Sequence, residues 1–138
     1  MAAIEWSARM NVGIPEIDRQ HQKLLELFND LEEGLSRSLP VKKPRVLFAE
    51  LVSYSKYHFL GEENLMQVAG WAGRDDHARV HAEFVAKVTE LERTLECEGN
   101  LEAALASSRF LRHWILRHIV VADRLAFATM EREGRLVG

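Results

Sequence analysis

The sequence has only one cysteine, Cys97, and no apolar run that approaches the roughly 20 residues of a membrane-spanning helix. A single cysteine excludes a disulfide framework, and we expect a reducing cytoplasm as the location. Basic residues are not in excess, since 18 lysines and arginines stand against 21 acidic residues, for a formal net charge of −3. Nucleic acid is therefore not an expected partner. The N-terminus lacks the basic and apolar regions of a signal peptide.

Proline is also rare, with three residues in 138, and no segment has the alternating pattern of a strand. The length suits one domain, 1–138, with a full core. An N-terminal arm, 1–13, precedes a stretch in which apolar residues recur every three or four positions. This spacing predicts an amphipathic helix that begins at Ile14 and Pro15 and ends before Pro40.

The same spacing predicts three further helices, over 45–69, 75–97 and 101–133. Residues 70–73 and 98–100 separate them, and both segments contain glycine, which favours helix ends and turns. Four amphipathic helices joined by short loops indicate an all-α fold, an up-down-up-down four-helix bundle with an N-terminal arm. The inward residues predicted for the last helix are Leu105, Leu111, Ile115, His118, Ala122 and Leu125.

Each predicted helix carries possible metal ligands on the stripe that should face the bundle interior. His58 and Glu62, for example, are four residues apart and share one helical face. A buried imidazole or carboxylate without a partner costs several kcal/mol, and metal coordination removes that cost. Seven protein ligands are too many for one ion but suit two six-coordinate ions bridged by the carboxylates. The candidates are His21, His58, Glu62, His77, His81, His118 and Asp123.

Simpler interpretations exist for parts of this set. His21 by itself is more typical of a core or surface histidine than of a ligand. His77 and His81 by themselves suit a two-histidine zinc site or a solvated face. For the whole set the alternative is a structural zinc bundle, although zinc prefers four ligands. His113 lies five residues before His118, about 140° around the helix, so we expect it to face outward and not to be a ligand.

Taken together, the pattern resembles the hemerythrin family in its bacterial single-domain form. The resemblance covers nearly the whole chain, and Trp6, Met66 and Trp114 also fit it. Gly61 lies between two of the ligands and should cost ~1 kcal/mol of helix stability compared with alanine. The residues that carry the resemblance are His21, His58-x-x-x-Glu62, His77-x-x-x-His81 and His118-x-x-x-x-Asp123.

The resemblance implies a di-iron centre that binds dioxygen reversibly. Three histidines would hold one iron, namely His77, His81 and His118. The other iron would be held by His21 and His58 and would have the open position for dioxygen. Both irons would share the bridging carboxylates Glu62 and Asp123, together with a solvent-derived oxo or hydroxo bridge.

An oxygen carrier, rather than an enzyme, is the function that this ligand set favours. Ferritin-like di-iron enzymes use mostly carboxylates, whereas five of these seven ligands are neutral imidazoles, and the residual positive charge disfavours further oxidation. Oxygen or redox sensing, and a di-iron oxidase or peroxidase, are the alternatives. Expected partners are dioxygen and an oxygen-consuming recipient protein, and we expect a monomer. Candidates for the dry dioxygen pocket are Leu24, Phe28, Phe59, Trp114 and Ile115.

The spacing of His118 and Asp123 does not fit a regular helix. Five residues correspond to about 140° of rotation, yet both side chains should reach one metal pair. Either the helix contains a π-type turn, which returns this spacing to one face, or Asp123 approaches from the flank of a regular helix. We favour the flank approach, because Ala122 and Leu125 continue the apolar stripe past His118.

Overall fold

The computed structural model describes residues 3–36, 42–98 and 101–136. Within these ranges there is no strand, and no helix is long and apolar enough to cross a membrane. α4 passes without a break into a π-helical segment, η2, and then into α5. The helices are α1 (Pro15–Ser36), α2 (Lys42–Val68), α3 (Arg74–Glu98), α4 (Leu101–Arg117), η2 (His118–Asp123) and α5 (Arg124–Arg132).

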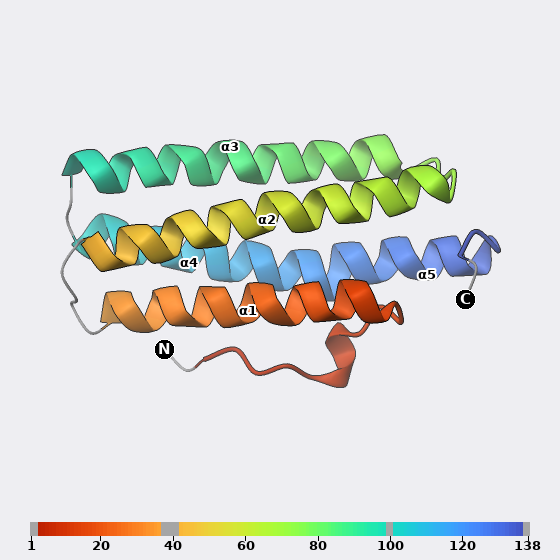
Figure 1. Cartoon of the computed structure of the whole chain (residues 1–138), viewed down its shortest axis with the longest axis horizontal. Helices are drawn as coiled ribbons and strands as arrows, with labels where there is room; N and C mark the ends of the chain where they lie inside the picture. The colour runs from red at the N-terminus through yellow and green to blue at the C-terminus, as the bar shows by residue number, and fades with distance from the viewer. Residues whose placement is uncertain (1–2, 37–41, 99–100, 137–138) are drawn as a thin grey trace.

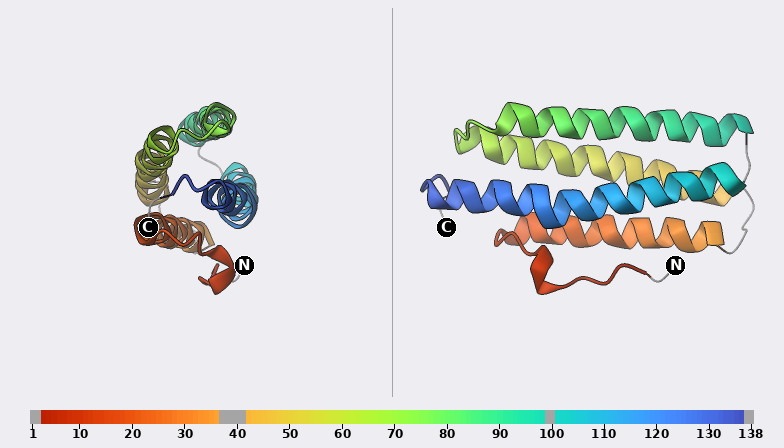
Figure 2. Two further views of the ribbon diagram at one scale, coloured as in Figure 1. Left: turned by 90° about the vertical axis from the view of Figure 1, so that its right-hand side faces the viewer. Right: turned by 180° about the vertical axis from the view of Figure 1, so that it is seen from behind.

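Four rods pack side by side, the fourth being α4, η2 and α5 in sequence (Figures 1 and 2). α1 contacts α2, α2 contacts α3, α3 contacts α4, and α4 returns to α1. Successive rods run in opposite directions. The predicted all-α, up-down-up-down bundle is therefore confirmed.

Two of the helices end at glycines with left-handed backbone. Gly70, with φ of 65°, follows α2, and Gly134, with φ of 68°, follows α5. At the first end the Trp71 N–H donates to the Met66 carbonyl at 3.1 Å. Such bonds satisfy carbonyl groups that the last helical turn leaves without a partner.

The N-terminal arm lies along the bundle next to α1 (Figure 1). It contains a short 3-10 helix, η1 (Ala8–Met10). Asn29 holds Ile4 by two hydrogen bonds, accepting from its N–H and donating to its carbonyl, each at 2.9 Å. Asp18 accepts from the Val12 N–H at 2.8 Å. These side chains of α1 fix the arm, and Ile4 and Met10 are buried in the core.

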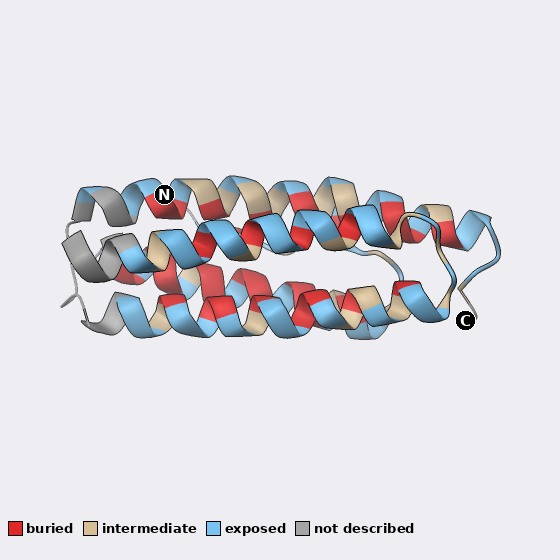
Figure 3. Ribbon diagram, turned by 90° about the horizontal axis from the view of Figure 1, so that it is seen from above, coloured by how far each residue is buried: buried red, intermediate tan, exposed pale blue. Residues whose placement is uncertain are grey.

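Buried side chains follow the inner face of each rod (Figure 3) and form two apolar clusters. The larger cluster includes Leu24, Phe59, Phe84 and Ile115. The smaller one consists of the buried residues Ile17, Met66, Ala126, Phe127 and Met130. Along α1 and α2 the predicted ligands lie between members of the two clusters, so a polar layer separates the apolar core into two parts.

The last rod corrects two predictions from the sequence. η2 is a π-helix, so the preference for a regular helix with a flank approach of Asp123 was wrong. A π-turn inserts one residue and shifts the apolar stripe beyond it by one position. Leu125, predicted to face inward, is accordingly 62% exposed, whereas Ala126 and Phe127 are buried. Leu105, near the start of α4, is 37% exposed and also lies outside the core.

Candidate metal centre

All seven predicted ligand side chains are buried and meet in the polar layer between the two clusters. Every rod contributes to it. α1 supplies His21, α2 supplies His58 and Glu62 one helical turn apart, and α3 supplies His77 and His81. The last rod supplies His118 and Asp123 from the two ends of η2. His113, by contrast, is exposed, as predicted.

The π-turn brings Asp123 onto the same face as His118. Its Oδ1 lies 2.8 Å from His77 Nε2 and 2.9 Å from His118 Nε2. Its Oδ2 lies 2.8 Å from His21 Nε2, which comes from the opposite side of the cluster. The two oxygens of this carboxylate therefore face two different groups of imidazoles.

Glu62 also lies between the two groups, but its oxygens are not divided between them. Its Oε1 lies 3.2 Å from His81 Nε2, 3.4 Å from His118 Nε2 and 3.5 Å from His58 Nε2, while its Oε2 lies 3.3 Å from His21 Nε2. The possible ligand atoms form two sets, and the atoms within each set all lie within 4.8 Å of one another. Both sets contain Glu62 and Asp123. One set adds three imidazoles, and the other adds two. The three are His77, His81 and His118, and the two are His21 and His58.

Two side chains that the sequence analysis missed hold the outer nitrogens of the ligand histidines. Gln20 Oε1 lies 2.7 Å from His58 Nδ1, and Glu63 Oε2 lies 2.8 Å from His81 Nδ1. A proton shared on the Nδ1 side leaves Nε2 free to bind a metal and fixes the plane of the ring. Each residue adjoins a ligand in the sequence, Gln20 before His21 and Glu63 after Glu62, and that adjacency is the only signal that the sequence offers.

The pKa values show how the cluster balances its charge without a metal. Burial lowers the pKa of His21, but its hydrogen bond to Asp123 and the nearby Glu62 carboxylate outweigh burial and raise the pKa to about 9. The same balance raises the pKa values of His77 and His118 to about 9.

His58 and the two carboxylates behave differently. Burial, only partly offset by Glu62, lowers the pKa of His58 to about 4. Burial favours the neutral form of both carboxyl groups, but the surrounding histidines lower the pKa values of Glu62 and Asp123 below their usual range. Protonated imidazoles therefore neutralise ionised carboxylates here, and a metal cation would take the place of these protons.

Several buried atoms in this layer have no hydrogen-bond partner. His58 Nε2 and Glu62 Oε2 both belong to the cluster, and neither is satisfied by a protein group. Buried polar atoms are nearly always paired, so such an exception calls for an explanation. Two atoms of metal-ligating type without a partner, within a cluster of five imidazoles and two carboxylates, fit a bound metal pair.

A small, partly enclosed cavity of about 10 Å³ adjoins the cluster on the side of the larger apolar core. Four of the five predicted pocket residues line it, and Phe28 lies in the core outside its walls. Trp114 stacks on the His118 ring with centroids 4.5 Å apart. The wall residues are Leu24, Ser55, Phe59, Phe84, Trp114, Ile115, His118 and Ile119.

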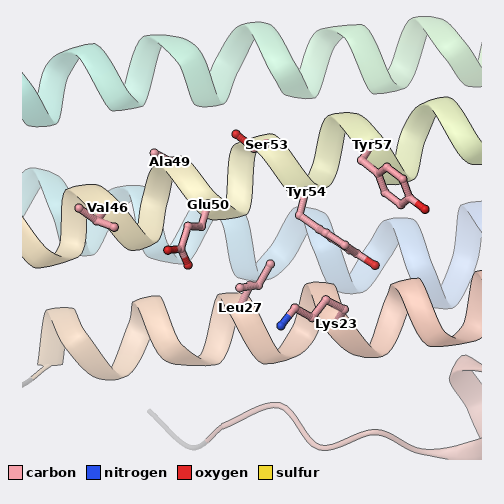
Figure 4. Close-up of a pocket in the computed structure, with 8 residues that line it drawn as sticks. All are labelled: Lys23, Leu27, Val46, Ala49, Glu50, Ser53, Tyr54 and Tyr57. Atoms are coloured by element: carbon pink, nitrogen blue, oxygen red, sulfur yellow. The ribbon is translucent and has the colours of Figure 1, made fainter.

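Open grooves lie on the outer surface of the described residues, and two of them are large. One, of about 620 Å³, runs between α1 and α2, and none of its lining residues belongs to the cluster (Figure 4). Tyr54 and Tyr57 of α2 and Lys23 and Leu27 of α1 are among them. The other, of about 550 Å³, lies between α2 and α3 and reaches the edge of His81. Of these three spaces, the cavity is the least open, and it lies between the cluster and the larger core.

The fold and the cluster define a class of protein, a four-helix bundle with a buried dinuclear metal site of imidazoles and carboxylates. Comparison with known proteins specifies the class further. Residues 12–130 match the hemerythrin HHE cation binding domain. The chain belongs to the hemerythrin family. The hemerythrin domain binds a non-haem di-iron centre, and members of the family are mainly oxygen-binding proteins rather than enzymes.

Individual relatives agree with this assignment. A bacteriohemerythrin of Stenotrophomonas maltophilia (strain R551-3) is 31% identical over 86% of this chain and 76% of its own length. A bacteriohemerythrin of Methylococcus capsulatus is 30% identical over 91% of this chain and 95% of its own length. The crystal structure of a wild-type hemerythrin superposes with a TM-score of 0.81 at 23% identity, covering 94% of this chain and 98% of the other. This structural match supports the fold.

Proposed function

We propose that the protein binds dioxygen reversibly and serves in oxygen transport, storage or delivery. One observation supports this function above others, namely that the two sets of ligand atoms are unequal and share both carboxylates. His77, His81 and His118 would hold one iron, and His21 and His58 the other. Glu62 and Asp123 would be shared by both irons, so the iron held by two histidines would have one fewer protein ligand and room for dioxygen.

Each part of the chain has a definite task in this scheme. Two ferrous ions bound here would supply the electrons needed for reversible binding of dioxygen. Gln20 and Glu63 orient His58 and His81 through their outer nitrogens. Most of the cavity wall is aromatic or aliphatic, which limits exchange with bulk water and protects a reversibly bound ligand.

The charge of the ligand set favours carriage over oxidation chemistry. Coordinated imidazoles are neutral, so only Glu62 and Asp123 offset the charge of two divalent ions. The site therefore retains positive charge, which disfavours loss of further electrons. Carboxylate-rich bundles of the ferritin type have the opposite balance.

Metal content and an optical titration test this proposal. Protein produced with iron should contain two irons per chain, and the reduced protein should change its spectrum in air and recover when oxygen is removed. Glu62→Ala should lose at least one iron. His113→Ala is the matched control, because this histidine is exposed on the same rod, and it should keep both. One zinc without iron, or continuous oxygen consumption with a reductant, would contradict the proposal.

A further inference from the structure

One wall of the small cavity carries a hydroxyl group. Ser55 lies on α2 one turn before His58 and is 1% exposed. Apart from His118, the other wall residues are aliphatic or aromatic. Apolar cavities of this kind stay dry, whereas a cavity with polar groups and enough room holds an ordered water. The Ser55 hydroxyl therefore makes this cavity more suitable for a water molecule than a wholly apolar cavity would be.

The hydrogen bonds of Ser55 determine which role its oxygen can play. Its hydroxyl donates to the Leu51 carbonyl at 2.8 Å, so its proton is already used. The lone pairs of Oγ remain able to accept a hydrogen bond. Ser55 therefore offers an acceptor to an occupant of the cavity.

His118 offers the complementary donor. A neutral imidazole that binds a metal through Nε2 carries its proton on Nδ1. His118 Nδ1 is buried and has no hydrogen-bond partner in the protein, and His118 forms part of the same cavity wall. A buried N–H without a partner is rare and is commonly satisfied by an internal water.

We propose that the cavity is a binding site for one water molecule, held between His118 Nδ1–H and Ser55 Oγ. The cavity volume limits the number of water molecules to one, because about 10 Å³ is close to the least space that accepts a water. The water would accept from His118 and donate to Ser55, which satisfies both groups. Dioxygen that reaches the iron through this cavity has to displace the water, because the space accepts only one small molecule, and it cannot reproduce these hydrogen bonds. Ser55 is in this way a specificity-determining residue that lowers the affinity for dioxygen.

The consequence for dioxygen binding rests on the proposed function, whereas the water site does not. Displacing a well-ordered water by a ligand without equivalent hydrogen bonds reduces affinity. Removing the hydroxyl should therefore raise the affinity for dioxygen by about fivefold, the equivalent of one ordinary hydrogen bond. Ser55→Ala should fold, because alanine is the better helix former.

High-resolution crystal structures and oxygen titrations of the iron-loaded protein and Ser55→Ala test the proposal. The expected results are one water peak between Ser55 and His118, no peak in the variant, and a fivefold gain in affinity. Ser53→Ala changes an exposed serine of the same helix and should leave both unchanged. A dry cavity in the unsubstituted protein, or a water that persists in Ser55→Ala, would overturn the proposal. If no dioxygen binds, the proposed function fails, and the electron density still decides the water site.

Discussion

Loading the metal-free protein with ferrous iron at pH 7.5 should release about three protons from imidazoles per chain. The pKa values of His21, His77 and His118 are raised to about 9, so each is mostly protonated at this pH. Metal binding requires these nitrogens to be deprotonated. The pKa of His58 is lowered to about 4, so this ligand is already neutral and releases no proton.

The free-energy cost of these protons depends on pH. At pH 7.5, about 1.5 units below the raised pKa values, each displaced proton costs about 2 kcal/mol of metal-binding free energy. The cost disappears as the pH passes 9. The iron affinity should therefore rise steeply between pH 7.5 and 9, by up to tenfold per pH unit for each proton released.

The assay is an anaerobic titration with ferrous iron in weakly buffered solution, with the released protons measured by a pH-stat. His77→Ala should release one proton fewer than the unsubstituted protein, whereas His58→Ala should release the same number. Both variants lose one ligand, and any proton from metal-bound solvent is common to all three proteins. Equal losses in the two variants, or no release from the unsubstituted protein, would refute the assignment of protons to these histidines.

The same pKa values predict how the metal-free bundle responds to pH. A histidine whose folded pKa is raised from 6.5 to about 9 stabilises the fold fully below pH 6.5, and this contribution is lost as the pH rises through 9. The free energy of unfolding of metal-free protein should therefore fall from pH 6.5 to 9. Iron-loaded protein should lack this fall, since its histidines are neutral in that range. Denaturant titrations at several pH values compare the two forms.

Three further predictions concern single positions. Ile115→Ala should enlarge the cavity and destabilise the fold by about 3 kcal/mol. It should also shorten the lifetime of the oxygenated protein while both irons are retained. An unchanged lifetime would exclude Ile115 from the dioxygen pocket. Gly61→Ala should raise the free energy of unfolding by about 1 kcal/mol, because a Cβ there would lie 3.5 Å from Gln20 Oε1, an ordinary contact; a fall in the melting temperature would show that the space is needed. Deleting Val121, an exposed residue of η2, should convert the π-turn into a regular turn that keeps Asp123 on the His118 face, so elemental analysis should still find two irons.

The meeting of the seven proposed ligand side chains was predictable, because all of them except Asp123 follow a regular helical spacing. Side chains three or four residues apart share a face whatever the details of packing, so His58 and Glu62 had to lie together. The π-turn was not predictable in the same way, because Leu125 continued the regular stripe in the sequence although it is exposed in the structure. One inserted residue changes the register without changing the composition.

The residues around the ligands were harder to predict. Gln20, Glu63 and Ser55 are polar residues whose roles depend on which side chain faces them from another helix or which cavity they line. Spacing along one helix carries no such information. Phe28 illustrates the same limit, since it is apolar and correctly placed inside, yet it lies outside the cavity walls.

The division of the apolar core by a polar layer has a consequence for cooperative unfolding. The smaller cluster, which includes Met66, Phe127 and Met130, contains few apolar side chains and is joined to the larger one through the layer of ligands. Bound metal would tie all four rods together across that layer, and we expect the two ends of the bundle then to unfold as one unit. In the metal-free protein we expect the smaller end to be a separate region of low stability, so backbone amides of α5 should exchange with solvent before those of α1 near Leu31. The metal would thus set the size of the folding unit as well as the chemistry at its centre.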